Sequence, residues 1–122
     1  MTTIMIVDDS ATILLSMSAI LRRAGFDVVT ASDGSDALTK LDGARPNLII
    51  SDLNMPRMDG LTFVQEARKR PGVRFTPILI LTTESHPEKR QEAKAVGATG
   101  WLVKPVGPDE LVTVIRQVLP GA

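Results

Sequence analysis

Short apolar segments alternate along the chain with longer stretches in which apolar residues recur at helical spacing. The apolar segments are rich in β-branched residues and nearly continuous, a pattern typical of strands buried on both faces of a sheet. Five such strands, separated by helices, predict an α/β fold with a parallel sheet. The segments cover residues 4–7, 28–31, 48–51, 78–81 and 101–103.

The stretches that follow these segments predict five helices. Four of them carry an apolar stripe, and glycine or proline residues follow where each pattern ends. The stretch 87–96 differs, because six of its residues are Glu, Lys, Arg or Gln and little apolar surface remains. We therefore expect that helix to be weakly anchored. The other four cover residues 11–24, 34–41, 60–70 and a segment that begins at Pro108.

A five-stranded parallel sheet of this kind is expected to be doubly wound. Its β-α-β connections are right-handed in almost all proteins. The common strand order is 2-1-3-4-5, with the ligand crevice at the carboxyl ends of strands 1 and 3. The 122 residues suffice for one core, and no linker, repeat or low-complexity tract divides them. We predict a single domain over residues 1–122.

Composition and charge narrow the classes of function. Lys+Arg and Asp+Glu balance at 14 each, which gives no indication of binding to nucleic acid or to an anionic membrane. The chain has no cysteine, so thiol catalysis, thiolate metal sites and disulfides are excluded. No apolar stretch approaches the roughly 20 residues of a membrane span, and the first strand starts too early to leave room for a signal peptide. We expect a cytoplasmic monomer.

Four of the five apolar segments stop at residues that can bind phosphate or a metal ion. The carboxyl ends of parallel strands meet at one edge of a sheet, so these side chains are expected to share a site. A single aspartate after a strand is often only a turn former or a helix cap, and the inference therefore depends on the whole set. The residues are Asp8 and Asp9 after the first segment, Asp52 after the third, Thr82 after the fourth and Lys104 after the fifth.

The three aspartates predict a site for a hard metal ion. Adjacent strands lie about 4.8 Å apart, so Asp9 and Asp52 can reach one cation, with Asp8 beside them or acting through water. Carboxylates this close repel unless their pKa values rise or a cation neutralises them. Ligands that are all oxygen select a hard ion, and Mg²⁺ is usually held by one or two carboxylates with water and phosphate.

Thr82 and Lys104 extend the prediction from metal binding to phosphoryl transfer. The Thr82 hydroxyl is expected about one strand spacing from Asp52, and the long Lys104 side chain can reach Asp52 or a phosphoryl oxygen. Carboxylate nucleophiles form aspartyl phosphates without a general base. A carboxylate beside Mg²⁺, an ammonium and a hydroxyl therefore indicates that Asp52 accepts a phosphoryl group.

The segments that carry these residues resemble the receiver domains of bacterial two-component response regulators, in particular the stand-alone chemotaxis regulators of the CheY type. The resemblance covers essentially the whole chain and implies a flavodoxin-like receiver fold. It also implies a histidine kinase as phosphodonor and a protein target on the face formed by the fourth helix, fifth strand and fifth helix. The matching segments are Ile6-Val7-Asp8-Asp9-Ser10, Ser51-Asp52-Leu53-Asn54-Met55-Pro56 with Met58-Asp59-Gly60, Leu81-Thr82-Thr83-Glu84, and Val103-Lys104-Pro105.

The resemblance implies a role for each residue of the acidic site. Asp52 matches the phosphoacceptor, and Lys104 matches the lysine that contacts the phosphoryl group. Asp9, Asp52 and the backbone carbonyl of Asn54 match the Mg²⁺ ligands. Asp8 matches the residue that acts on the metal through water.

Further residues match positions that control the signal. Thr82 matches the switch hydroxyl, and Trp101 stands where the family places an aromatic that rotates inward with it. A buried tryptophan in a strand is often only a core residue, so both interpretations of Trp101 stay open. Asn54 and Glu84 match positions that tune hydrolysis of the aspartyl phosphate.

Smaller expectations concern single positions. The resemblance implies a cis bond between Lys104 and Pro105. Gly60 is expected to open the third helix because glycine tolerates unusual backbone angles. Arg90 lies on a helix face that is more apolar in relatives that bind the flagellar motor, so that partner stays open.

The leading hypothesis is a phosphorylation-activated signalling switch, with chemotaxis as the expected pathway. Such a regulator assists its own phosphorylation and dephosphorylation and is not an enzyme that acts on another substrate. One alternative is a phosphate sink that drains a kinase, and another is a single-domain regulator outside chemotaxis. A Mg²⁺-dependent aspartyl-phosphate phosphatase is disfavoured, because the residue two after Asp52 is Asn54 and no loop is long enough to form a lid. The chain end at Pro120-Gly121-Ala122 argues mildly against a receiver cut from a DNA-binding regulator.

Overall fold

The computed structural model describes residues 2–119, where the expected strands and helices are present. The terminal Pro120-Gly121-Ala122 lies outside these residues. In chain order the elements are β1 (Thr3–Val7), α1 (Ala11–Arg23), β2 (Asp27–Ala31), α2 (Gly34–Ala44), β3 (Leu48–Ser51), α3 (Gly60–Arg68), the 3₁₀ helix η1 (Pro71–Val73), β4 (Ile78–Thr82), α4 (Pro87–Ala95), β5 (Gly100–Val103) and α5 (Pro108–Val118).

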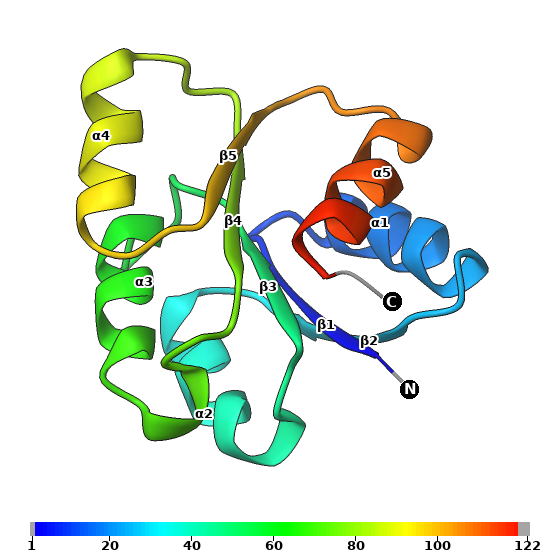
Figure 1. Cartoon of the computed structure of the whole chain (residues 1–122), viewed down its shortest axis with the longest axis horizontal. Helices are drawn as coiled ribbons and strands as arrows, with labels where there is room; N and C mark the ends of the chain where they lie inside the picture. The colour runs from blue at the N-terminus through cyan, green and yellow to red at the C-terminus, as the bar shows by residue number, and fades with distance from the viewer. Residues whose placement is uncertain (1, 120–122) are drawn as a thin grey trace.

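The strands form one parallel sheet in the order β2-β1-β3-β4-β5, which confirms the predicted topology. Helices α2, α3 and α4 cover one face of the sheet, and α1 and α5 cover the other (Figure 1). The register pairs Val7 of β1 with Ser51 of β3, so Asp8 and Asp52 leave the sheet side by side. Among the described residues, no helix has the length and apolar character needed to cross a bilayer.

Two apolar cores lie on opposite faces of the sheet. Phe63 is fully buried among residues from α2, α3 and the sheet, whereas Leu21, Leu111 and Ile115 pack on the other face. Strands β3 and β4 are buried along their whole length, as the continuous apolar runs predicted. The edge strands β2 and β5 are mostly half-buried, because each has a strand neighbour on one side only, so the prediction of full burial is wrong for them.

Polar caps fix the starts of the helices that follow β1, β2 and β3. The side chains of Ser10, Asp33 and Asp59 each accept a hydrogen bond from the backbone N–H three residues later, at 3.3, 2.7 and 2.8 Å. Such caps satisfy a donor that the first helical turn leaves free. They hold the three helix starts at the same edge of the sheet as the predicted site.

Helix α2 continues three residues beyond the predicted end, through Asp42-Gly43 to Ala44. A single glycine inside a helix costs only about 1 kcal/mol, so it need not stop the helix. The helix ends at Arg45, which has a φ of 45° and precedes Pro46. Proline disfavours helical geometry in the residue before it, and this is the stronger stop signal.

Helices α4 and α5 differ in how they are held. Ala93 is the one buried residue of α4. The N-cap residue before the helix, His86, makes no side-chain hydrogen bond to the first turn. Helix α5 buries Leu111 and Ile115, with Val114 and Val118 packed against the same core. The expectation that residues 87–96 form a weakly anchored helix is confirmed.

Arg68, at the end of α3, ties together three segments at the edge where β4 and β5 begin. Its guanidinium donates to the carbonyl of Gly97 at 2.8 and 3.1 Å, and to those of Val73 and Thr76 at 2.7 and 2.6 Å. Burial lowers the pKa of Arg68 from its usual value. Gly97 has a φ of +108°, a backbone angle that suits glycine.

Candidate functional site

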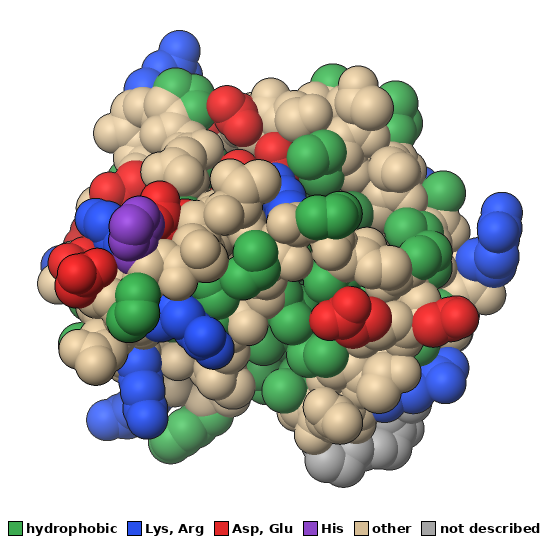
Figure 2. Space-filling view, turned by 90° about the horizontal axis from the view of Figure 1, so that it is seen from above, with side chains coloured by type: hydrophobic (Ala, Val, Ile, Leu, Met, Phe, Trp, Pro, Cys, Tyr) green, Lys and Arg blue, Asp and Glu red, His purple; other side chains and the backbone are tan. Residues whose placement is uncertain are grey.

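The three aspartates predicted to share a site do so. One carboxylate oxygen from each of Asp8, Asp9 and Asp52 lies within 4.8 Å of the other two. Asp8 is buried, Asp52 is half-buried and Asp9 is exposed, so the cluster runs from the interior to the surface. Figure 2 looks onto this edge of the sheet and shows acidic and basic side chains gathered in the middle of it.

Asp8 is the most constrained carboxylate of the cluster. One of its oxygens accepts a hydrogen bond from the backbone N–H of Ser10 at 2.9 Å. The other accepts from the Nζ atom of Lys104 at 3.0 Å. The Lys104 ammonium lies 3.6 Å from the nearest oxygen of Asp52. Lys104 therefore bridges two carboxylates and contacts Asp8 more closely than Asp52, a pairing that the strand-end pattern did not predict.

One oxygen of the Asp52 carboxylate is hydrogen-bonded to the backbone, but the negative charge of the group is not fully balanced by its neighbours. Its Oδ1 atom accepts a hydrogen bond from the backbone N–H of Leu53 at 2.7 Å. Burial raises the pKa of Asp52 from its usual value. Lys104 opposes this shift, Asp8 adds to it, and the backbone N–H groups of Leu53 and Asn54 lower it again without cancelling it. These backbone donors left no side-chain signal in the sequence.

Gly60 allows the start of α3 to approach Asp52. A Cβ atom at this position would collide with the carbonyl oxygen of Asp52 and lie 2.8 Å from the Cα of Leu53. The backbone N–H of Gly60 donates to the Leu53 carbonyl at 2.7 Å. Gly60 is not among the residues with positive φ, so the reason given from sequence is wrong. Close packing behind the carboxylate, and not an unusual backbone angle, requires glycine here.

Thr82 and Trp101 meet at the backbone of Glu84. Thr82 is 1% exposed, and its hydroxyl oxygen accepts a hydrogen bond from the Glu84 N–H at 3.2 Å. The indole N–H of Trp101 donates to the Glu84 carbonyl at 3.1 Å. The Trp101 ring is half-buried against the core on the α2, α3 and α4 face. Trp101 is thus a core contact and also a tether for the loop that leads into α4.

The donor set fits a hard divalent cation. The three carboxylates lie together, and the one ammonium beside them contacts only Asp8 and Asp52. Oxygen donors suit a hard ion such as Mg²⁺, and the exposed Asp9 leaves access from solvent. Asn54 is exposed in the loop directly after Asp52 and Leu53. The Lys104-Pro105 peptide bond is cis, as expected.

The model of the response regulator receiver domain family matches residues 4–116, and the chain belongs to this family. The fold is similar to those of solved receiver domains and response regulators. The chemotaxis response regulator CheY4 of Vibrio cholerae is 52% identical, with a TM-score of 0.94 over 97% of this chain and 98% of CheY4. Protein PilG of Pseudomonas aeruginosa is 33% identical over 118 residues, which is 97% of this chain and 87% of PilG.

Two further relatives define what the family includes. The receiver domain of the Pseudomonas aeruginosa sensor histidine kinase PA1611, solved with magnesium coordinated in its active-site cleft, is 26% identical, with a TM-score of 0.89 over 97% of both chains. A probable transcriptional regulator, ycf27 of Porphyridium aerugineum, is 40% identical over 95% of this chain but only 47% of its own length. The chain thus spans about half the length of several curated relatives. Receiver domains receive phosphate from histidine kinases and act on downstream targets, and this chain is a receiver domain of that type.

Proposed function

We propose that the chain is a Mg²⁺-dependent signalling switch in which Asp52 accepts a phosphoryl group from a histidine kinase. The observation that carries the proposal is the convergence of Asp8, Asp9 and Asp52 at one edge of the sheet, with the Lys104 ammonium against Asp8 and Asp52. A structural role does not require three neighbouring carboxylates, because their repulsion opposes folding.

Each residue has a distinct part in this proposal. Asp9, Asp52 and the Asn54 carbonyl would hold Mg²⁺, with Asp8 acting through water, and the bound ion would offset negative charge on the phosphoryl oxygens. Asp52 offers its Oδ2 atom as the nucleophile, since Oδ1 is held by the Leu53 N–H. Lys104 neutralises charge on the phosphoryl group.

The signal would leave the site through the loop before α4. A phosphoryl group on Asp52 draws the Thr82 hydroxyl away from the Glu84 N–H, and the Trp101 tether to the Glu84 carbonyl changes with it. Helix α4 follows this loop and buries only Ala93, so it is the element most easily repositioned. The α4-β5-α5 face then changes its affinity for a protein target. Asn54 and Glu84 flank the site from its two loops and set how fast the aspartyl phosphate hydrolyses.

Phosphorylation by a small donor tests the acceptor. With acetyl phosphate and Mg²⁺, intact-mass spectrometry should show one phosphoryl group on the wild type and none on the Asp52→Asn variant. Asp27→Asn, which removes an exposed aspartate of β2, is the matched control and should be modified like the wild type. An Asp52→Asn variant modified as fully as the control would contradict the assignment.

Fluorescence tests the output route. Trp101 is the single tryptophan of the chain, so its emission reports one position. Emission should change when Mg²⁺ and beryllofluoride, a phosphoryl mimic, are added to the wild type but not to Asp52→Asn. An unchanged spectrum in both would make Trp101 a core residue only.

We propose that the chain acts in chemotaxis, because the chemotaxis protein CheY4 is 52% identical to it over nearly the full length of both chains. The half-length match to transcriptional regulators supports the alternative, a receiver that serves another output. Deletion of the gene should alter the motility of the host. Normal motility, together with no partner that prefers the phosphorylated form, would instead favour a sink or another pathway.

A further inference from the structure

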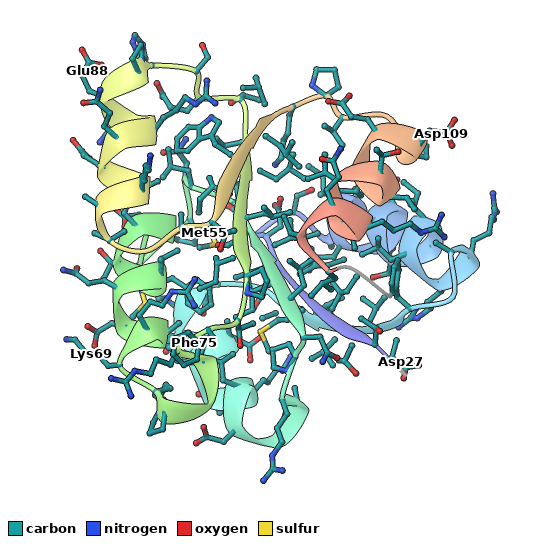
Figure 3. The ribbon with its side chains drawn as sticks, viewed as in Figure 1. Asp27, Met55, Lys69, Phe75, Glu88 and Asp109 are labelled. Carbon is teal, nitrogen blue, oxygen red and sulfur yellow. The ribbon has the colours of Figure 1, made fainter. Side chains whose placement is uncertain are left out.

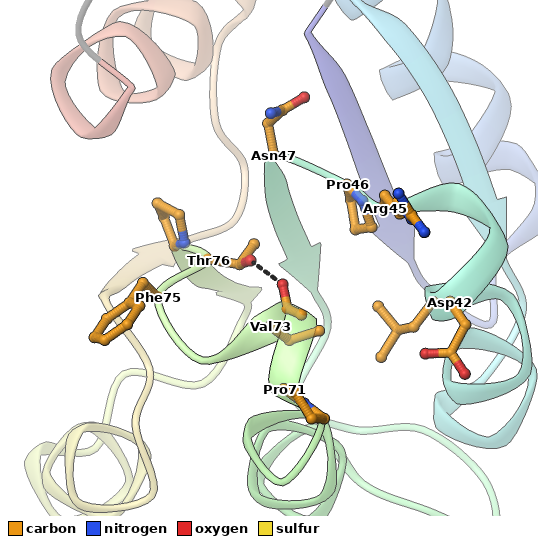
Figure 4. A pocket seen from close by; sticks show the side chains of 11 residues that line it. Asp42, Arg45, Pro46, Asn47, Pro71, Val73, Phe75 and Thr76 are labelled. Carbon is orange, nitrogen blue, oxygen red and sulfur yellow. Dashed lines mark hydrogen bonds between the residues drawn. The ribbon is translucent and has the colours of Figure 1, made fainter.

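The opposite edge of the sheet, where β3 and β4 begin, carries a groove of about 780 Å³ that the proposed function does not use. One wall comes from the end of α2 and the residues before β3, and the other from η1 and the residues before β4 (Figure 4). The apolar surface open to solvent in this groove comes from the exposed Pro71 and Phe75 and the half-buried Pro77, whereas Leu41 and Val73 of the lining are buried. The five residues of β4, at about 3.3 Å each, separate the groove from Thr82 by roughly 17 Å.

Phe75 lies at the lip of this groove, on the loop before β4 (Figures 3 and 4). Its side chain is 89% exposed, more than any other large hydrophobic side chain in the described residues. Folding gains nothing from an aromatic ring left in water, whereas aromatic residues beside apolar pockets are typical of binding surfaces. The ring and the groove together form a surface suited to a partner with its own apolar side chain.

The charges around the groove are mainly positive. Arg70 pairs with Asp42, the one acidic residue of the lining, at 3.5 Å. Arg45 lines the groove and Arg74 precedes Phe75, and both are exposed. Neither of these two arginines forms a salt bridge with a carboxylate within residues 2–119. Since the whole chain is neutral, this excess is local and complements a negative partner.

We infer that this groove is a docking site for a short acidic peptide segment of a partner protein. An apolar side chain of the segment would enter between the walls beside Phe75, and its carboxylates would pair with Arg45 and Arg74. The inference does not depend on Asp52, because the groove and the acidic cluster lie at opposite ends of the same strands.

Other occupants fit the surface less well. A phosphate backbone would use the arginines but would leave the apolar surface at Pro71 and Phe75 without a matching group. An anionic membrane could contact the exposed Phe75, but its flat surface would not fill the groove. A second copy of the chain would bring Arg45 and Arg74 of one molecule against the same residues of the other, because a two-fold interface joins identical patches. Like charges would then oppose the contact.

Peptide selection tests the inference directly. A library of random 12-residue peptides displayed on phage is panned against the wild-type protein without Mg²⁺ or phosphodonor, with counter-selection on the Arg45→Glu/Arg74→Glu variant. The enriched peptides should carry Asp or Glu beside Leu, Ile, Phe or Trp. In fluorescence anisotropy, a dye-labelled synthetic copy of an enriched peptide should bind at least tenfold more weakly to Phe75→Ser and to Arg45→Glu/Arg74→Glu than to the wild type. Leu15→Ser, which removes a 75% exposed side chain from α1, is the control and should bind like the wild type.

Several results would overturn the inference. They are enriched peptides without acidic residues, binding that Phe75→Ser leaves unchanged, and an equal loss in Leu15→Ser. Self-association in analytical ultracentrifugation that Phe75→Ser abolishes would assign the surface to a second copy instead. All four side chains are exposed, so circular dichroism should show every variant folded. Acetyl phosphate should modify them all, which separates this test from that of the acceptor site.

Discussion

At the carboxyl edge of the sheet three carboxylates cluster beside a single ammonium that contacts two of them, whereas at the amino edge one guanidinium donates to three backbone carbonyls. Lys104 contacts Asp8 and Asp52, and the cluster keeps an excess of negative charge. Arg68 makes four hydrogen bonds to three carbonyls and has no carboxylate partner in the described residues. Both sites are partly buried, but the acidic cluster keeps unbalanced charge, whereas the Arg68 guanidinium is held by four hydrogen bonds.

The difference separates a structural charge from a functional one. Arg68 is the donor for the carbonyls of Thr76 and Gly97 and a second donor for that of Val73, and so it stabilises the fold. The aspartate cluster keeps an excess of negative charge, which lowers the stability of the fold and favours binding of a cation. Changes at the two edges should therefore affect stability in opposite directions.

Removing the structural charge should have the largest effect on stability. Arg68→Met keeps the apolar stem but leaves the carbonyls of Thr76 and Gly97 without their donor, and that of Val73 with the Thr76 N–H alone, which should cost about 3 kcal/mol of unfolding free energy. Urea denaturation measures this, with the exposed Arg22→Met on α1 as the control. A loss below about 0.5 kcal/mol would show that Arg68 is not structural.

Binding of Mg²⁺, the cation proposed for the acidic cluster, should have the next largest effect on stability. At a Mg²⁺ concentration 100 times the dissociation constant, the wild type should gain about 2.7 kcal/mol, and chelation should remove the gain. Asp9→Asn and Asp52→Asn should each gain much less. Asp42→Asn, which changes an exposed aspartate at the other edge, should gain as much as the wild type. An equal gain in all four proteins would place the cation elsewhere.

Removing a carboxylate from the cluster should have the smallest effect on stability. It should stabilise the protein, whereas the loss of Arg68 should destabilise it. Without Mg²⁺ at pH 7, Asp52→Asn should be more stable than the wild type by about 1 kcal/mol, because the cost of burying the Asp52 charge, together with repulsion from Asp8, is only partly offset by Lys104 and the backbone N–H groups of Leu53 and Asn54.

The pH dependence gives this effect its signature. The pKa of Asp52 is raised in the folded protein, so the folded state holds that proton more tightly than the unfolded chain. The wild type should therefore lose stability as the pH rises from the ordinary carboxyl range through the raised pKa. The advantage of Asp52→Asn should shrink as the pH falls below that range. An advantage that does not vary with pH would assign it to another cause.

The fold and the membership of the acidic cluster could be predicted because both depend on strands. Each run such as Leu48–Ser51 marks a buried strand, and parallel order places whatever follows it at one edge. The same reasoning predicts that Asp8, Asp9 and Asp52 lie together, and the structure confirms it.

The missed features depend on partners that sequence does not mark. Arg68 bonds to backbone carbonyls, which every residue carries, so its role left no pattern. Lys104 prefers Asp8 because of side-chain reach within the folded site, and strand order alone did not separate Asp8 from Asp52 as partners. The helix predicted over residues 34–41 runs on to Ala44, because Gly43 alone does not stop it and Pro46 acts only on the residue before it, Arg45.

The carboxyl edge of the sheet should accept a phosphoryl group on one of its three carboxylates, that of Asp52. After treatment with acetyl phosphate and Mg²⁺, borohydride reduction converts an aspartyl phosphate to homoserine, which mass spectrometry of peptides can locate. Homoserine should appear at residue 52 alone and should vanish when Mg²⁺ is chelated. Homoserine at residue 8 or 9, or the same yield at residue 52 without Mg²⁺, would contradict the account.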